Sequence, residues 1–270
     1  MKKSLGILCL VLCLSIGLVA CSGKDDSKKE VEKDNNNKTE TVELNISAAA
    51  SLKEAMAELE KEYKKENDNV KLTVNFGASG SLQQQIEQGA PCDVFISAGK
   101  KQMDALDEKD LIVKETNKGL VENDLVLIAP KDSKLEKIDG ITTNDVKKIA
   151  VGEPESVPAG KYADEVLTNL KLKDQLKDKL VFAKDVKEVL AWVQSGEADA
   201  GFVYLSDTIK NDKIKVVATT EADTHSPITY PIAVIKDSNK VDEAKKFEEF
   251  LLSDKGQTIL EKYGYKKIAK

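Results

Sequence analysis

The stretch Asn45-Ile46-Ser47-Ala48-Ala49-Ala50-Ser51-Leu52-Lys53-Glu54 carries a short apolar strand into the start of a helix. Ser51 followed three residues later by Glu54 is typical of a capping box, which predicts that a helix begins at Ser51. A strand that ends at a helix N-terminus leaves free backbone N–H groups, and the positive end of the helix dipole points to the same place. One such corner can bind an anion, so the function depends on whether the chain builds several and brings them together.

The order of strand and then helix continues along the chain. Strands are predicted at 42–47, 70–76 and 93–97, and helices at 52–66, 82–88 and 99–107. An apolar run at 125–130 is expected to be a strand buried on both faces. The pattern then restarts with strands at 148–152, 180–182, 200–204 and 230–235 and helices at 159–170, 186–195, 242–252 and 254–263. This alternation predicts an α/β fold with mixed, mainly parallel sheets flanked by helices.

The alternation falls into two halves, which predicts two lobes. The first lobe is expected at 42–124 plus 231–270 and the second lobe at 125–230. Two strands, near 123–127 and near 228–233, are expected to cross between them. The cleft between such lobes is the expected ligand site.

The chain begins with the features of a secretory signal. Two lysines precede an apolar run at 5–20, which is shorter than the roughly 20 residues that span a bilayer. The sequence Leu18-Val19-Ala20-Cys21 resembles a bacterial lipobox, in which cleavage precedes the cysteine and the cysteine receives lipid. The alternative is an ordinary secretory signal that is cut nearby. We expect a lipoprotein signal peptide at 1–20, a polar disordered tether at 21–41, and an extracytoplasmic body anchored to the membrane through Cys21.

The charge and the reactive side chains exclude several functions. The net charge of −6 becomes more negative when the signal takes its lysines with it, so no nucleic-acid partner is expected. An anionic ligand must then be held by local dipoles and hydrogen bonds. Cys92 is the only thiol expected to remain, and His225 is the only histidine, so neither a disulfide framework nor a Cys/His metal site is predicted. Cys92 is expected to be a half-buried small apolar residue rather than a nucleophile.

Four corners between strands and helices share one chemistry. They are 50–51, 78–81, 157–161 and 184–188, and each offers hydroxyls or backbone N–H groups. A tetrahedral oxyanion that is fully deprotonated carries only acceptors, so donors alone satisfy it best. A partly protonated anion such as phosphate would favour a carboxylate in the site. Asp185 is the nearby candidate, but with Glu188 it forms a capping box, and we expect it to cap its own helix.

Each feature also has a purely structural interpretation. Ser51 could cap its helix and have no role in binding, and Ser79 could occupy a turn without binding a ligand. Tyr204 could be a core ring with an exposed hydroxyl. A secreted hydrolase with Ser51 or Ser79 as nucleophile is a further alternative. It lacks the Gly-x-Ser-x-Gly elbow, and His225 lies in a polar loop where a surface position is expected.

Several motifs resemble one known family. They are Ala48-Ala49-Ala50-Ser51-Leu52, Phe76-Gly77-Ala78-Ser79-Gly80-Ser81-Leu82, the stretch 89–98, Val151-Gly152-Glu153-Pro154 with Val157-Pro158-Ala159-Gly160, and Tyr263-Gly264-Tyr265. Together they resemble the molybdate-binding proteins of bacterial ABC importers, the ModA family, in its lipoprotein form. The resemblance runs from about residue 43 to the C-terminus. Gly80-Ser81 and Cys92 depart from the family pattern, and neither changes the expected ligand set.

The resemblance implies a type II periplasmic-binding-protein fold that closes on molybdate or tungstate. It implies a monomer without enzyme activity or cofactor, which delivers its solute to a membrane permease and its ATPase. The ligand groups that it implies are the hydroxyls and amides of Ser51 and Ser79, the backbone N–H groups of Ala159 and Val186, and the phenol of Tyr204. The same fold could instead bind sulfate or phosphate.

Overall fold

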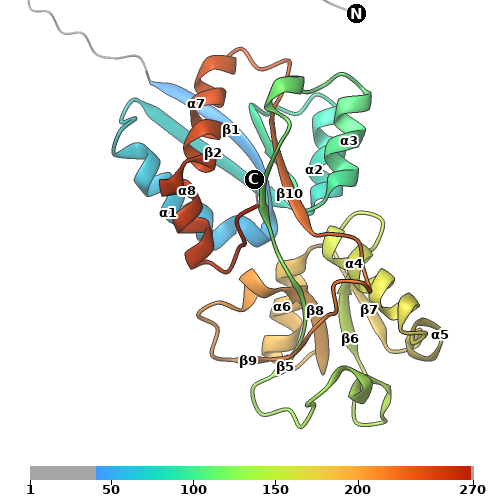
Figure 1. The fold of residues 1–270 in the computed structure, drawn as a ribbon. Coiled ribbons are helices and arrows are strands. Elements are labelled where there is room, and N and C mark those ends of the chain that lie inside the picture. The colour runs from blue at the N-terminus through green and yellow to red at the C-terminus, as the bar shows by residue number, and fades with distance from the viewer. Residues whose placement is uncertain (1–40, 269–270) are drawn as a thin grey trace, which may run out of the picture. The chain divides into compact units, whose positions relative to one another are not determined.

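The computed structural model describes residues 41–268, which belong to one compact unit, Thr39–Lys270 (Figure 1). The expected signal peptide, almost all of the expected tether and Cys21 lie outside the described residues. No helix in the described part of the chain has the length and apolar character that crossing a bilayer requires.

The first lobe is built on a sheet with the strand order β2-β1-β3-β10-β4. Its strands are β1 (Val42–Ala49), β2 (Val70–Gly77), β3 (Val94–Ile96), β4 (Lys118–Glu122) and β10 (Thr229–Val234). Strands β2 and β3 run parallel to β1, whereas β10 is antiparallel to both β3 and β4. Burial alternates along the first part of β2, as expected for an edge strand with one face covered.

The second lobe is built on a sheet with the order β7-β6-β8-β5-β9. Its strands are β5 (Leu125–Pro130), β6 (Ile149–Gly152), β7 (Leu180–Ala183), β8 (Ala200–Tyr204) and β9 (Ile214–Thr219). Strands β7 and β8 run parallel to β6, and β5 is antiparallel to β8 and β9. The predicted α/β class with mixed sheets flanked by helices is therefore confirmed, but the sheets are not mainly parallel, since parallel and antiparallel neighbours are equally represented in each.

Helices cover both sheets. They are α1 (Lys53–Lys64), α2 (Ser79–Glu87), α3 (Lys100–Glu108), α4 (Pro158–Asn169), α5 (Lys173–Leu176), α6 (Val186–Ser195), α7 (Val241–Leu252) and α8 (Asp254–Lys262). Helices α1, α7 and α8 pack together on one side of the first sheet, and α2 and α3 pack together on the other (Figure 1). Helix α1 buries Met56, Leu59 and Tyr63, which recur at helical spacing and form its core-facing side.

Two short connections join the lobes. The first is Asn123 and Asp124, between β4 and β5, and the second is the segment 220–228, between β9 and β10. Strands β4 and β9 were not among the strands that the sequence pattern predicts. Both lie at the edge of a sheet, where one side is unpaired, and their sequences lack the continuous apolar run of a central strand.

Cys92 is buried, and its thiol donates a hydrogen bond to the carbonyl of Val94 at 3.2 Å. Burial raises the pKa of this thiol to about 11. The side chain is therefore buried rather than half-buried as predicted.

We expect Cys92 to react with a thiol-specific dye at pH 8 at least about 100-fold more slowly in the folded chain than in urea. The reason is that the thiolate is the reactive species, and an unperturbed thiol with a pKa near 8.5 is partly ionised at this pH. The measurement is the rate of dye release from a chain of residues 22–270, in which Cys92 is the only thiol. Equal rates in the two conditions would show that Cys92 is accessible and ionised in the folded chain.

Candidate functional site

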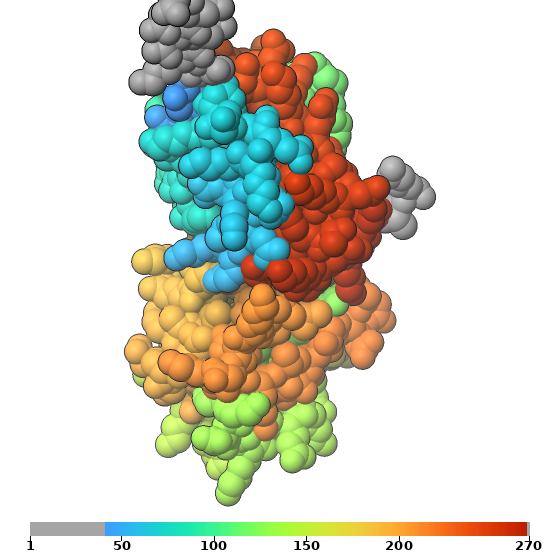
Figure 2. All heavy atoms as spheres, turned by 90° about the vertical axis from the view of Figure 1, so that its left-hand side faces the viewer, coloured from blue at the N-terminus to red at the C-terminus, as the bar shows by residue number. Residues whose placement is uncertain are grey.

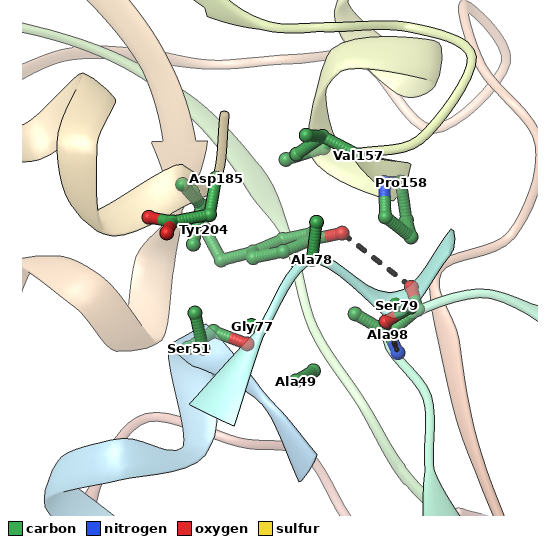
Figure 3. A pocket seen from close by; sticks show the side chains of 13 residues that line it. Ala49, Ser51, Gly77, Ala78, Ser79, Ala98, Val157, Pro158, Asp185 and Tyr204 are labelled. Atoms are coloured by element: carbon green, nitrogen blue, oxygen red, sulfur yellow. Dashed lines mark hydrogen bonds between the residues drawn. The ribbon is translucent and has the colours of Figure 1, made fainter. Parts of the chain in front are cut away.

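A small cavity lies between the two lobes, where the ends of several strands meet the first turns of helices (Figure 3). The space in it that is open to a water-sized sphere is about 10 Å³, far below the roughly 300–1,000 Å³ of pockets for drug-sized ligands, so it suits only a small solute. The cavity is lined by Ala49, Ala50, Ser51, Gly77, Ala78, Ser79, Ala98, Val157, Pro158, Ala159, Asp185, Val186 and Tyr204. The structure thus brings together all five residues that the family resemblance singled out.

Ser51 does not cap α1, so the predicted capping box is wrong. The residue lies inside a 3-10 turn (Ala50–Leu52), α1 begins only at Lys53, and no side-chain cap bond forms at either start. The Ser51 hydroxyl instead lies 2.8 Å from the hydroxyl of Tyr230, deep in the first lobe. Because Ser51 lies inside the 3-10 turn, it does not stand at the N-cap position of α1. Its hydroxyl therefore bonds the buried phenol of Tyr230 instead of a backbone N–H of the helix.

Ser79 is the first residue of α2 and is almost completely buried. Its Oγ accepts a hydrogen bond from the backbone N–H of Ala98 at 2.9 Å. One lone pair of the hydroxyl is therefore occupied from behind, and its proton remains available to a partner in the cavity. The backbone N–H of Ser79 belongs to the first turn of the helix, where no intrahelical partner exists.

The second lobe offers two helix N-termini to the same cavity. Ala159 is the second residue of α4, and Val186 is the first residue of α6. Asp185 accepts from the backbone N–H of Glu188 at 3.0 Å, which confirms that it caps α6. The Glu188 carboxylate accepts from the backbone N–H of Lys184 at 2.8 Å, one residue earlier than in a standard capping box. In Figure 3 the carboxylate of Asp185 is directed away from the cavity.

Tyr204, at the end of β8, reaches across the cavity (Figure 3). Its hydroxyl donates to the carbonyl of Ala98, in the first lobe, at 3.4 Å. The side chain is completely buried, and burial raises the pKa of the phenol well above its ordinary value. The phenol therefore keeps its proton at neutral pH and acts as a neutral hydrogen-bond donor.

Other contacts also join the lobes around the cavity. The backbone N–H of Gly80 in α2 donates to the carbonyl of Ser156 at 2.9 Å. On another side, the ammonium of Lys187 in α6 lies 2.6 Å from the carboxylate of Glu54 in α1 and 2.7 Å from that of Asp207. Burial lowers the pKa of Lys187, but the two carboxylates raise it by more, so the side chain stays charged. The space-filling view shows the surfaces of the two lobes in contact (Figure 2). The two lobes are therefore in contact around the cavity.

Sequence reasoning missed the side chains behind the cavity. Tyr230 bonds the Ser51 hydroxyl, and Tyr265 donates from its hydroxyl to the Ser51 carbonyl at 2.9 Å. The rings of Tyr204, Tyr230 and Tyr265 form a chain with centroid separations of 5.6 and 5.5 Å. The motif around Tyr265 carried a family resemblance but no local signal of this contact, because its partner is far away in the sequence.

His225 does not contact either candidate nucleophile. Its Nδ1 lies 2.8 Å from the carbonyl of Ser226, and its ring packs against Tyr162 with a centroid separation of 6.0 Å. The hydroxyls of Ser51 and Ser79 have other partners, as described above. A serine–histidine pair of the kind that activates a nucleophile is therefore not formed by these residues.

Known proteins resemble this chain in both sequence and structure. A family model described as bacterial extracellular solute-binding protein matches residues 44–266. The chain is 42% identical over 230 residues to the molybdate-binding protein ModA of Haemophilus influenzae, with 83% of this chain and 90% of that protein covered. It is 40% identical over 267 residues to YvgL of Bacillus subtilis, provisionally described as a substrate-binding lipoprotein of an ABC transporter, with 98% and 99% covered.

A solved structure also resembles this chain. It is provisionally described as the substrate-binding domain of a molybdenum ABC transporter from Clostridium difficile. Its sequence is 74% identical, the match covers 85% of this chain and 100% of that chain, and the TM-score is 0.68. The chain therefore belongs to the bacterial extracellular solute-binding proteins, in the family that includes the ModA molybdate-binding proteins.

Proposed function

We propose that this protein captures molybdate or tungstate in the cavity between its lobes and delivers it to an ABC transporter. The observation that carries the proposal is the convergence of Ser51, Ser79, Ala159, Val186 and Tyr204 on one small cavity. In this assignment the serines bind through hydroxyl and amide, and Ala159 and Val186 bind through backbone N–H groups. Tyr204 binds through its phenol, whose single proton turns from the Ala98 carbonyl to the solute. The molybdenum is bound as its oxyanion, and no residue ligates a metal cation directly.

The chemistry of these groups fits a fully deprotonated tetrahedral oxyanion. Such a dianion presents only acceptors, and burying it is very costly unless several hydrogen bonds meet it. Hydrogen bonds to a charged partner contribute roughly 1.5–3 kcal/mol each, so a shell of five or more supports tight binding. Asp185 turns its carboxylate to its own helix, so among the described residues that line the cavity no carboxylate faces the proton of an anion such as hydrogen phosphate.

The family assignment decides the class of activity. Solute-binding proteins of ABC transporters are non-catalytic components of transport, so the serine hydrolase alternative does not apply. Molybdate is the cargo in this assignment and not a cofactor. Sulfate and phosphate remain the competing solutes, since the fold alone does not choose between oxyanions.

We further propose how the protein is held outside the cell membrane. The lipobox and the polar segment before the folded unit support lipidation of Cys21 and a tether at 21–41. The lipoprotein description of the Bacillus subtilis relative, which spans nearly the whole chain, supports the same anchor. The monomeric protein would then reorient on its tether and present its closed form to the permease and its ATPase.

A thermal-shift panel of molybdate, tungstate, sulfate, phosphate and chromate tests the proposed solute. A ligand that binds only the folded chain stabilises it by about 2.7 kcal/mol at 100 times its dissociation constant. We expect molybdate and tungstate to raise the melting temperature by several degrees at micromolar concentration, and phosphate to leave it unchanged.

The control for this panel is the Ser79→Ala chain. Loss of a charge-assisted hydrogen bond should weaken molybdate binding by roughly 1–3 kcal/mol and so reduce the thermal shift, while the unliganded chain stays folded. A shift with sulfate or phosphate and none with molybdate would replace the proposed solute. Equal molybdate shifts for both chains would remove Ser79 from the site.

A further inference from the structure

A buried polar cluster lies behind the Ser51 hydroxyl. Tyr230 is fully buried, and its hydroxyl lies 2.8 Å from the Ser51 Oγ and 3.4 Å from the side-chain nitrogen of Asn123. The same Asn123 nitrogen donates to the Ser206 hydroxyl at 2.9 Å. Asn123 stands in one of the two connections between the lobes, so this cluster joins the hinge to the cavity.

The bonds of Asn123 favour one direction for this chain of hydroxyls. Its Oδ1 accepts from the backbone N–H of Asp124 at 2.9 Å, so its nitrogen must face Ser206 and Tyr230. The Tyr230 hydroxyl accepts from Asn123, and its single proton can then go to the Ser51 oxygen at 2.8 Å, a pair in which the distance alone allows either donor. Ser51 then receives a hydrogen bond from Tyr230 and keeps its own proton for the cavity.

The opposite direction would damage the site. If Ser51 donated to Tyr230, its oxygen would present a lone pair to a bound oxyanion, and two acceptors would face each other in a buried place. Ser79 avoids this problem because a backbone N–H, which can only donate, occupies the back of its hydroxyl. The Ser51 hydroxyl instead contacts the phenol of Tyr230, which can donate or accept a hydrogen bond. The direction of the hydrogen bond between Ser51 and Tyr230 therefore depends on a further group.

We propose that Tyr230, oriented by Asn123, is a positioning residue that fixes the Ser51 hydroxyl as a donor to the bound oxyanion. This inference rests on the proposed function. It assigns to Tyr230 a role that it exerts through Ser51 and not through contact with the solute, since Tyr230 does not line the cavity. Its consequence is that Tyr230 matters for binding only while the Ser51 hydroxyl is present.

A double-mutant cycle tests this dependence by calorimetry with molybdate. We expect Tyr230→Phe to weaken binding about tenfold, the size of one hydrogen bond of about 1.4 kcal/mol to the anion. In a Ser51→Ala background, the same Tyr230→Phe change should alter binding by less than twofold. A merely structural role of Tyr230 would weaken binding equally in both backgrounds.

Tyr63→Phe is the matched control. Tyr63 is also a buried tyrosine of the first lobe, and its hydroxyl has no hydrogen-bond partner among the described residues. This variant should bind molybdate as the unchanged chain does. Melting temperatures of all variants without ligand show whether each one folds.

The outcomes separate this inference from the proposed function. Unchanged binding by Tyr230→Phe, or an equal loss in both backgrounds, overturns the role of Tyr230 and leaves the molybdate assignment standing. An unchanged chain that binds sulfate and not molybdate overturns the proposed solute, and the same cycle run with sulfate then decides the role of Tyr230. An unchanged chain that binds no oxyanion overturns both.

Discussion

Replacement of Gly80 by valine is expected to weaken molybdate binding about 10- to 100-fold and to leave the unliganded chain folded. A Cβ at position 80 would lie 2.7 Å from the carbonyl oxygen of Ser156 and 2.8 Å from its Cα. Gly80 belongs to the first lobe and Ser156 to the second, so the clash arises only when the lobes close. Steric overpacking costs typically 1–3 kcal/mol, and each 1.4 kcal/mol is tenfold in affinity. The whole cost falls on the closed form, and binding to that form weakens accordingly.

Ser81→Val is the matched control for this change. It places the same side chain at the next position of α2, where Ser81 is exposed. Calorimetry with molybdate should show full affinity for Ser81→Val and the loss for Gly80→Val, and both chains should melt at similar temperatures without ligand. Full affinity of the Gly80→Val chain would mean that binding does not require the contact between Gly80 and Ser156.

Replacement of Gly160 by alanine is expected to lower the free energy of unfolding by about 3 kcal/mol, at the upper end of overpacking costs. A Cβ there would lie 2.0 Å from the carbonyl oxygen of Gly152 and 2.5 Å from its carbonyl carbon. These are backbone atoms of β6, so α4 must move away from the sheet. The sign of the change in unfolding free energy tests this crowding, because Gly→Ala inside an uncrowded helix stabilises the chain by about 1 kcal/mol.

Urea denaturation of the unliganded chain measures this effect. Thr168→Ala, at an exposed position of the same helix, is the control and should stay within about 0.5 kcal/mol of the unchanged chain. The Gly160→Ala chain should also bind molybdate more weakly, since the shift of α4 displaces the neighbouring N–H of Ala159. A more stable Gly160→Ala chain would show that the first turn of α4 is not packed against β6.

The sequence predicts the strand and helix order and the four corners that line the cavity because both depend on local patterns, whereas Tyr204 was assigned to the site only by the family resemblance. A helix N-terminus after a strand is visible in a few residues, as at Ser79 and at Val186. The capping of α1 by Ser51 could not be judged in the same way, since the partner that replaces it, Tyr230, is 179 residues away. Residues such as Asn123 and Tyr265 gain their roles from packing between distant segments, which one sequence does not reveal. Edge strands β4 and β9 also gain their structure from pairing with a neighbour rather than from a strong pattern of their own.

The two partners of Lys187 have a consequence for release of the solute. Its bond to Glu54 crosses from one lobe to the other, whereas its bond to Asp207 stays within the second lobe. When the lobes separate, the half-exposed Glu54 returns to water, and the buried Asp207 keeps its cation. Separating a fully buried pair would leave an uncompensated charge at a cost of roughly 3–5 kcal/mol, and opening here creates none. Separation of the lobes at this contact therefore leaves no buried charge without a partner, so the ion pairs of Lys187 do not lock the lobes together.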